Sequence, residues 1–158
     1  MVLFLAQTPV YPLVSKAKAF KGMAKHLPDF LTTFIDLLGN TPVLYITDSS
    51  PPPPSGPTSP LIQLLLTWLN PMTMSQYRAI RHTATFIAMA VGVGICKVAK
   101  RTKAVIRSAE KARDQAAGKR AKQNVTKGTK GDAFKAQIKD GKSKLEVLDS
   151  YLTDIFDG

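Results

Sequence analysis

Apolar residues recur at every third or fourth position along most of the chain, which is the spacing of one face of an α-helix. The most continuous stripe lies in residues 75–98 and comprises Tyr77, Ile80, Ala84, Ile87, Val91, Ile95 and Val98. Ser75 stands where the N-cap of that helix is expected. Phe86, Met89 and Val93 lie off the stripe, so the pattern predicts a helix that is packed on more than one side.

The same period continues beyond Val98, although the composition becomes basic. The first continuing stripe comprises Ile95, Val98, Thr102, Val105, Ala109, Ala112 and Ala116. After a turn-like segment, a second stripe comprises Phe134, Ile138, Gly141, Leu145, Leu148, Leu152 and Ile155. Two stripes of similar length on either side of a glycine-containing turn predict an antiparallel helical hairpin. Folding about residue 126 or 127 sets Ala112 opposite Gly141, which predicts a thin point between the two helices.

The first half of the chain is also helical in pattern, with one interruption. Residues 15–40 predict one helix, or two helices with a break at Pro28, and Gly39-Asn40 is a helix stop. Residues 48–60 are rich in proline and predict a surface loop or polyproline spacer. Residues 60–72 predict a short buried helix that begins at Pro60, ends at Pro71 and places Trp68 in the core.

Together these elements predict an all-α fold, namely a HEAT-like helical-repeat (α-solenoid) segment followed by a long antiparallel basic helical hairpin. We divide the chain into an N-terminal tail (1–10), a helical segment (11–98) and the hairpin (99–158). The turn of the hairpin is expected near residues 124–131.

Charge is concentrated in one part of the chain. The net charge of the 158 residues is +11, whereas residues 97–144 alone hold 16 Lys/Arg against four acids. This asymmetry predicts a polyanionic partner, and the alternative is a solvated helical arm that keeps the protein soluble. The candidate DNA-binding residues on the first hairpin helix are Lys97, Lys100, Arg101, Lys103, Arg107, Lys111, Arg113, Lys119, Arg120 and Lys122.

A second basic group precedes them on the helix. Arg78, Arg81 and His82 share one helical face, opposite the apolar stripe. Arg78 and Arg81 are further candidates for phosphate contact, and the alternative is a polar contact between elements, with His82 hydrogen-bonded to a neighbouring loop.

The sequence shows no spacing of cysteine, histidine, acidic or glycine residues that is typical of a catalytic or metal-binding site. The single cysteine, Cys96, excludes an intramolecular disulfide and a cysteine-based metal cluster, and its position predicts an inert core thiol. His26 and His82 have no acid or cysteine at ligand spacing. Gly141-Lys142-Ser143 resembles the end of a phosphate-binding loop, but Ala136 stands where that loop needs its first glycine. We therefore expect no enzyme activity, cofactor, metal or small-molecule substrate.

A membrane-associated hairpin is a further alternative. The run Thr83 to Cys96 is uncharged over 14 residues, whereas a membrane-spanning helix needs about 20. We therefore expect this run to be the core of a folded protein and expect no membrane partner.

Three stretches carry a resemblance to a known family. "YPLVSKAKAFKG" (11–22), "LLLTWLNPMTMSQYRAIRHTATFIAMAV" (64–91) and "GKRAKQNVTKG" (118–128) resemble, in order and spacing, the stromalin or stromal-antigen (STAG) subunits of cohesin. The resemblance extends over about residues 11 to 156. Ile80 departs from it, because a phenylalanine is common there, and so does the proline-rich loop.

The resemblance implies a non-catalytic, nuclear, chromosome-bound subunit. Members of the family bind double-stranded DNA and the kleisin and SMC subunits of cohesin, and they support sister-chromatid cohesion. The family continues beyond the equivalent of Gly158, so this chain looks like an N-terminal fragment, a truncated gene model or a short paralogue. Much of the kleisin contact of the family lies beyond this position. The leading hypothesis is therefore a STAG-type DNA-binding module, with a generic helical scaffold as the alternative.

Overall fold

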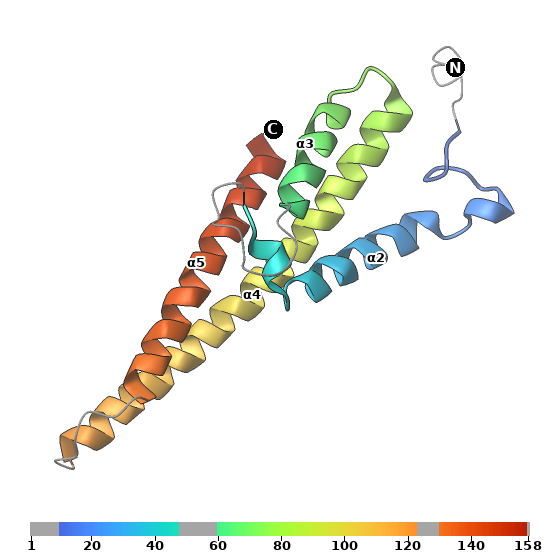
Figure 1. The fold of residues 1–158 in the computed structure, drawn as a ribbon. Coiled ribbons are helices and arrows are strands. Elements are labelled where there is room, and N and C mark those ends of the chain that lie inside the picture. The colour runs from blue at the N-terminus through green and yellow to red at the C-terminus, as the bar shows by residue number, and fades with distance from the viewer. Residues whose placement is uncertain (1–9, 48–59, 123–129, 158) are drawn as a thin grey trace.

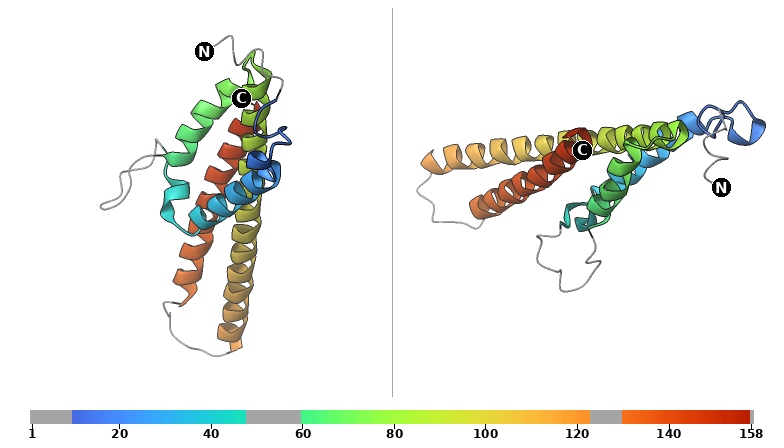
Figure 2. Two further views of the ribbon diagram at one scale, coloured as in Figure 1. Left: turned by 90° about the vertical axis from the view of Figure 1, so that its right-hand side faces the viewer. Right: turned by 90° about the horizontal axis from the view of Figure 1, so that it is seen from above.

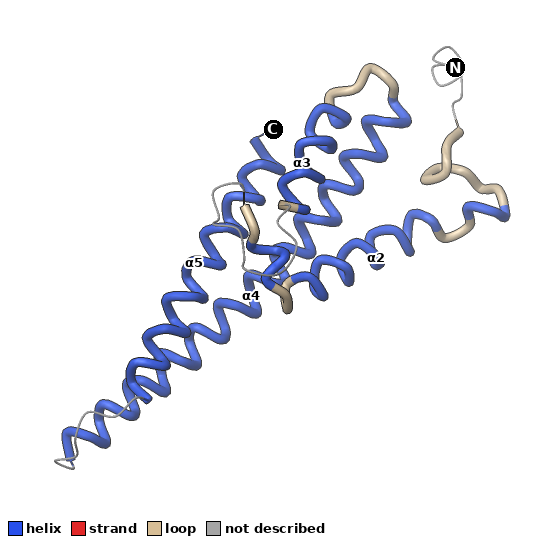
Figure 3. The backbone as a smooth tube through the Cα atoms, viewed as in Figure 1, coloured by secondary structure: helices blue, strands red, loops and turns tan. Residues whose placement is uncertain are grey.

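A computed structural model describes residues 10–47, 60–122 and 130–157, and the regular structure in these residues is helical throughout (Figure 3). The elements in chain order are η1 (Lys18–Phe20), α2 (Met23–Leu38), η2 (Pro42–Tyr45), α3 (Leu61–Thr73), α4 (Arg78–Lys122) and α5 (Lys130–Asp157). The all-α prediction is confirmed. The predicted tail and proline-rich loop lie outside the described residues, apart from Val10 and Pro60.

Helix α4 is the spine of the molecule. It is 45 residues long, and α2, α3 and α5 all pack against it (Figure 1). Its predicted apolar stripe is confirmed, because Ala84, Val91, Ile95 and Val98 are buried. Met89 and Val93, in contrast, are exposed. The extra sides of α4 are packed through alanine and glycine rather than through these large side chains.

The core lies where α2, η2, α3 and α5 meet around the first half of α4. Ile35 of α2, Leu44 of η2 and Ile62 of α3 are fully buried there, together with Leu148 and Tyr151 of α5. Because every one of these elements contributes to one cluster, the hydrophobic effect holds the start, middle and end of the chain together.

Helix α2 begins at a glycine and continues through a proline. Gly22, its N-cap, has φ +87°, a backbone conformation that only glycine adopts without strain. Pro28 lies inside the helix and does not break it. Proline has a helical φ and removes a single hydrogen bond, here the bond to the exposed first-turn residue Ala24. Pro28 therefore does not divide the helix, and Gly39 ends it as predicted. The predicted start at residue 15 is wrong, because α2 begins at Met23 and only the 3₁₀ turn η1 precedes Gly22.

Close approach of α2 to α4 depends on two glycines. A Cβ atom on Gly94 would lie 2.8 Å from Cβ of Ile35, and a Cβ atom on Gly39 would lie 2.8 Å from Cγ2 of Val98. Each glycine therefore sits under a buried branched side chain of the other helix. Larger residues would push the two helices apart.

Three predictions about local structure near α3 are wrong. The helix does not end at Pro71, because α3 continues through this proline to Thr73. Trp68 is 64% exposed, because the buried face of α3 is formed by Ile62, Leu66 and Leu69 instead. Ser75 is not the N-cap of α4. The carbonyl of Tyr77 accepts the first helical hydrogen bond, from the N–H of Arg81, and the Ser75 hydroxyl instead accepts the N–H of Tyr77 at 3.2 Å.

The hairpin of α4 and α5 is antiparallel, as predicted (Figure 2), but its register differs. Val105 is 44% exposed, whereas its neighbour Ile106 is 7% exposed and packs with Ala109 and Ile138. A Cβ atom on Gly141 would lie 2.6 Å from Cγ1 of Ile106. The predicted pairing of Gly141 with Ala112 is therefore wrong, and Ile106 fills the expected thin point.

The hairpin turn lies mostly outside the described residues, between the end of α4 and the start of α5. The division of the chain at residue 98 remains a prediction, and α4 runs through that position without interruption.

Candidate nucleic-acid interface

The basic residues gather on what we call the basic arm, residues 99–122 of α4 with residues 130–144 of α5. Beyond the core these two helices run side by side, away from α2 and α3 (Figure 1). A small apolar cluster around Ile106, Ala109 and Ile138 holds them together. Because this seam is narrow, most of the circumference of each helix faces solvent.

One face of α4 in the arm carries four exposed basic residues with a regular spacing. They are Lys100, Lys103, Arg107 and Lys111, separated by steps of 3, 4 and 4 residues. This spacing places them in one row on the side away from the seam. Among the described residues none of the four forms an ion pair. The row is thus a line of free positive charge along a rigid helix.

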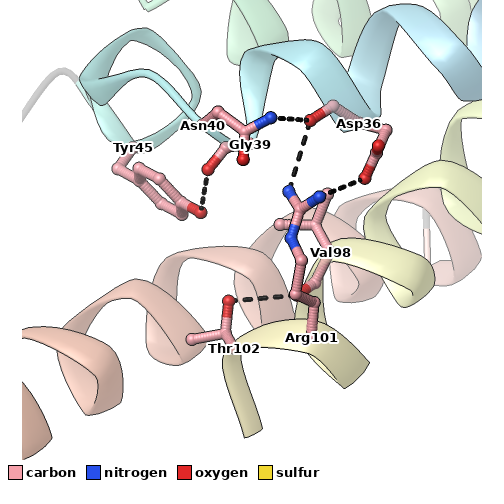
Figure 4. A network of polar contacts seen from close by, with 7 residues as sticks. All are labelled: Asp36, Gly39, Asn40, Tyr45, Val98, Arg101 and Thr102. Carbon is pink, nitrogen blue, oxygen red and sulfur yellow. Dashed lines mark hydrogen bonds and ion pairs between the residues drawn. The ribbon is translucent and has the colours of Figure 1, made fainter. Parts of the chain in front are cut away.

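Arg101, a predicted DNA-binding residue, has a structural partner. Its Nη1 lies 2.8 Å from Oδ1 of Asp36 in α2, and its Nη2 donates to the backbone carbonyl of Asp36 at 3.3 Å (Figure 4). The carbonyl also accepts a hydrogen bond from the Asn40 side chain at 3.3 Å. The guanidinium therefore reaches back to the C-terminal turn of α2, where cations are also favoured by the helix dipole.

The remaining predicted bases fall into three positions. Lys97 is exposed at the start of the basic stretch. Arg113 is paired with Asp114, with Nη2 and Oδ1 3.0 Å apart. Lys119, Arg120 and Lys122 belong to the last turns of α4, and their side chains lie outside the described part of the structure.

Sequence reasoning missed a basic cluster on α5. Lys135, Lys139 and Lys142 line a cavity of about 510 Å³ together with Arg113 of α4. Ile138 and Ser143 also line this cavity, and Glu146 is its one acidic residue. The lysines recur at steps of 4 and 3 residues. That helical spacing is the signal in the sequence that predicts a shared face for the three lysines.

The Arg78, Arg81 and His82 group is far along α4 from the arm. The ring nitrogen Nδ1 of His82 is hydrogen-bonded to the hydroxyl of Tyr11, and Nη1 of Arg81 donates to the carbonyl of Ser75 at 2.8 Å. His82 therefore contacts a neighbouring segment, as in the alternative that the sequence offered to phosphate contact, namely a polar contact between elements. Arg78 is exposed. The structure does not bring Arg78 and Arg81 together with the basic arm.

Two further features bear on chemistry. Cys96 is exposed, so its prediction as a core thiol is wrong. Among the described residues, no group of three or more His, Cys, Asp or Glu side chains is placed to hold a metal ion.

Helix α4 is long and apolar enough to cross a membrane on length and composition alone. Half of its most apolar stretch is buried inside the fold. A buried core helix passes the same test, because both environments select apolar side chains.

The STAG domain family matches residues 9–137. The chain belongs to the STAG-domain family. It is also 26% identical over 151 residues to the cohesin subunit psc3 of Schizosaccharomyces pombe, an alignment that covers 93% of this chain and 14% of psc3. The chain thus spans a small part of that relative's length.

The family match includes α2, α3 and α4 and ends within α5. In this STAG domain the row of four free bases and Lys135 fall inside the matched residues, whereas Lys139 and Lys142 follow directly after them. The basic arm is therefore largely within the matched domain.

Proposed function

We propose that this STAG domain binds double-stranded DNA through its basic arm, as part of a non-catalytic cohesin subunit. Membership of the STAG-domain family and similarity to a cohesin subunit support the assignment to cohesin. By resemblance, the partners are the kleisin and SMC subunits, the location is the nucleus and its chromosomes, and the role is to support sister-chromatid cohesion.

The observation that carries the DNA-binding role is the row Lys100, Lys103, Arg107 and Lys111. Its ends are 11 residues apart, which is about 16 Å along a helix. Phosphates on one DNA strand repeat about every 3.4 Å along the duplex axis. The row is therefore long enough for its four basic side chains to contact several phosphates of one duplex. Lys139 and Lys142 on α5 extend the positive surface around the arm.

Binding of this kind depends on contacts with phosphates rather than with nucleobases. Lysine and arginine contacts to phosphates position a protein on DNA without sequence information. Each phosphate contact releases a counterion, so affinity falls steeply with salt. With four contacts, the slope of log affinity against log salt is about −3.6, and affinity falls about 150-fold between 50 and 200 mM salt.

The test compares two variants with the same net charge. In the first, Lys100, Lys103, Arg107 and Lys111 are replaced by Glu. In the second, the control, four exposed lysines near the N-terminus are replaced by Glu: Lys16, Lys18, Lys21 and Lys25. Affinity for a 30-base-pair duplex is measured by fluorescence anisotropy at several salt concentrations, with helicity checked by circular dichroism.

We expect the first variant to lose both affinity and salt dependence for duplexes of any sequence. The control is expected to keep most of the slope, because its charges lie away from the arm. Equal loss in both variants would mean that net charge alone drives binding. Unchanged binding in the first variant would leave the arm as a solubilising element of a helical scaffold.

Membrane association is the second candidate function, because α4 is long and apolar enough to span a membrane. Alkaline extraction of cell membranes separates the two candidates, because an integral segment stays with the membrane. We expect the protein in the aqueous fraction, since the apolar stripe of α4 is already covered by α2, α3 and α5. Retention in the membrane fraction would favour the second candidate.

A further inference from the structure

Helix α3 is apolar on two faces, and only one of them is covered. Ile62, Leu66 and Leu69 are buried, whereas a second row of large apolar residues is exposed. That row comprises Leu61, Leu64, Trp68 and Met72. Its steps of 3, 4 and 4 residues keep it on one side of the helix. Contiguous exposed apolar surface of this kind marks interaction sites in soluble proteins.

The exposed row leads into a groove between the end of α3 and the start of α4, which we call the Trp68 groove. It has a volume of about 600 Å³ and is lined by Thr67, Trp68, Pro71 and Met72 of α3 and by Ser75, Tyr77 and Ile80. This volume is within the range of pockets that enclose side chains or small ligands. The groove therefore has room for more than one apolar side chain.

The rim of the groove is basic. Nη1 of Arg81 lies 2.8 Å from the carbonyl oxygen of Ser75, a groove-lining residue, so this guanidinium lies beside the groove. No acidic residue lines the groove. Among the described residues, Arg81 takes part in no ion pair. A ligand that enters the groove thus meets positive charge at its edge.

This combination of an apolar floor and a basic rim selects among possible occupants. Nucleic acid would meet apolar side chains where its phosphates need donors. A second copy would bring its own Arg81 to the same rim, where like charges would oppose that contact. An amphipathic protein segment with carboxylates beside its apolar face satisfies both features.

We propose that the Trp68 groove binds an acidic amphipathic helix of a partner protein, with apolar side chains against Trp68 and Met72 and a carboxylate at Arg81. In helix-in-groove recognition the bound helix places apolar anchors at i, i+3 or i+4, and i+7, and the exposed apolar row on α3 offers these anchors a surface along one side of a helix. Tryptophan and arginine are also the residue types that dominate binding energy at interfaces. The site lies on α3 and the start of α4, so it is separate from the basic arm.

The test starts from a display library of random 16-residue peptides, selected on the full chain and on three variants. Trp68→Ala removes the main apolar contact, and Arg81→Glu reverses the charge of the rim. Phe30→Ala removes an equally exposed aromatic residue from α2 and serves as the matched control. Because Trp68 is the only tryptophan, its fluorescence reports directly on occupancy of the groove.

We expect selection of peptides with helically spaced apolar residues and flanking Asp or Glu. A synthetic selected peptide should shift the Trp68 emission to shorter wavelength and protect it from quenching by acrylamide. Trp68→Ala should weaken binding by at least about 30-fold, whereas Phe30→Ala should not. Arg81→Glu should change the preferred flanking residues from acidic to basic.

Three results would overturn the proposal. The first is selection of peptides whose binding does not depend on Trp68. The second is a preference for basic flanks on the unaltered chain. The third is self-association in sedimentation velocity that Trp68→Ala abolishes, because the occupant would then be a second copy.

Discussion

Up to residue 98, α4 packs against α2, α3 and α5, and we call this part of the molecule the core end. In the basic arm, which begins at residue 99 of α4, α5 runs alongside α4, and α2 contacts the arm through the pair of Asp36 with Arg101 (Figure 1). At the core end, side chains from five elements form one buried cluster. In the arm, the buried cluster contains only Ile106, Ala109 and Ile138. The two regions thus share one helix and differ in how much of it is covered.

The core end and the basic arm also differ in the composition of the outward face of α4. Met89, Val93 and Cys96 of the core end are exposed on the side that continues as Lys100 and Lys103 of the arm. The helical period is unchanged across this junction. What changes is the number of packing partners, and a helix held by one narrow seam leaves its remaining surface free to carry charge.

The sharpest way to break this comparison is to place the same charge in each region. Leu148→Asp at the core end puts an unpaired carboxylate into a fully buried site, which we expect to cost at least about 4–5 kcal/mol. That loss is comparable to the total stability of a small domain, about 5–15 kcal/mol. Ile138→Asp in the arm should cost about 2–3 kcal/mol, because the carboxylate can reach water at the edge of the seam.

Circular dichroism and hydrogen exchange distinguish these outcomes. Leu148→Asp should lose most of its helicity, whereas Ile138→Asp should exchange rapidly only in the arm. Lys135→Glu, at an exposed position, is the control and should retain full helicity. Equal loss of helicity in Leu148→Asp and Ile138→Asp would show that core end and arm unfold as one unit.

A second way to sharpen the comparison uses two glycines of α4. A Cβ atom on Gly94 would lie 2.8 Å from Cβ of Ile35 in α2, whereas a Cβ atom on Gly92 would lie 3.8 Å from Cδ1 of Ile155 in α5. Gly94→Ala should therefore destabilise the protein by about 1–3 kcal/mol through overpacking. Gly92→Ala should stabilise it by about 0.5–1 kcal/mol, because alanine favours a helix over glycine.

Urea unfolding followed by circular dichroism measures both changes on the same scale. The sign of the difference is the decisive result, since both substitutions add one methyl group to the same helix. If Gly94→Ala is as stable as Gly92→Ala, the close packing of α2 on α4 at the core end does not limit stability.

Periodicity predicted the helices and the hairpin, but it did not predict the register of the arm. A strict seven-residue repeat averages 3.5 residues per turn, whereas a straight α-helix has 3.6, so the two drift apart by about 20° per heptad. In a helix as long as α4, this drift moves the seam from Val105 to Ile106. The pattern on α5 is confirmed because its large residues, such as Ile138 and Leu148, leave less choice of face.

Other differences depend on contacts that no local pattern contains. Trp68 is as apolar as its neighbours, and only the positions of α4 and α5 decide which face of α3 is buried. Arg101 looks like any base of the arm until Asp36, 65 residues earlier, is brought next to it. The concentration of charge in the sequence therefore identifies the candidate interface. The structure shows which of its basic residues are free of ion pairs.

The smallest expected effect concerns the difference between basic residues that are paired and those that are free. Arg101 and Lys103 lie two residues apart in α4, yet only Arg101 reaches the core end, where it pairs with Asp36 at 2.8 Å. Both partners are more than one-third exposed, so Arg101→Gln should cost at most about 1 kcal/mol of stability. If the guanidinium is occupied by Asp36, this substitution should leave the salt slope of DNA binding unchanged. Lys103→Gln is the matched control, because it removes one free charge from the row and should lower the slope by about 0.9. An equal drop in slope for both substitutions would show that Arg101 leaves Asp36 and joins the DNA-binding row.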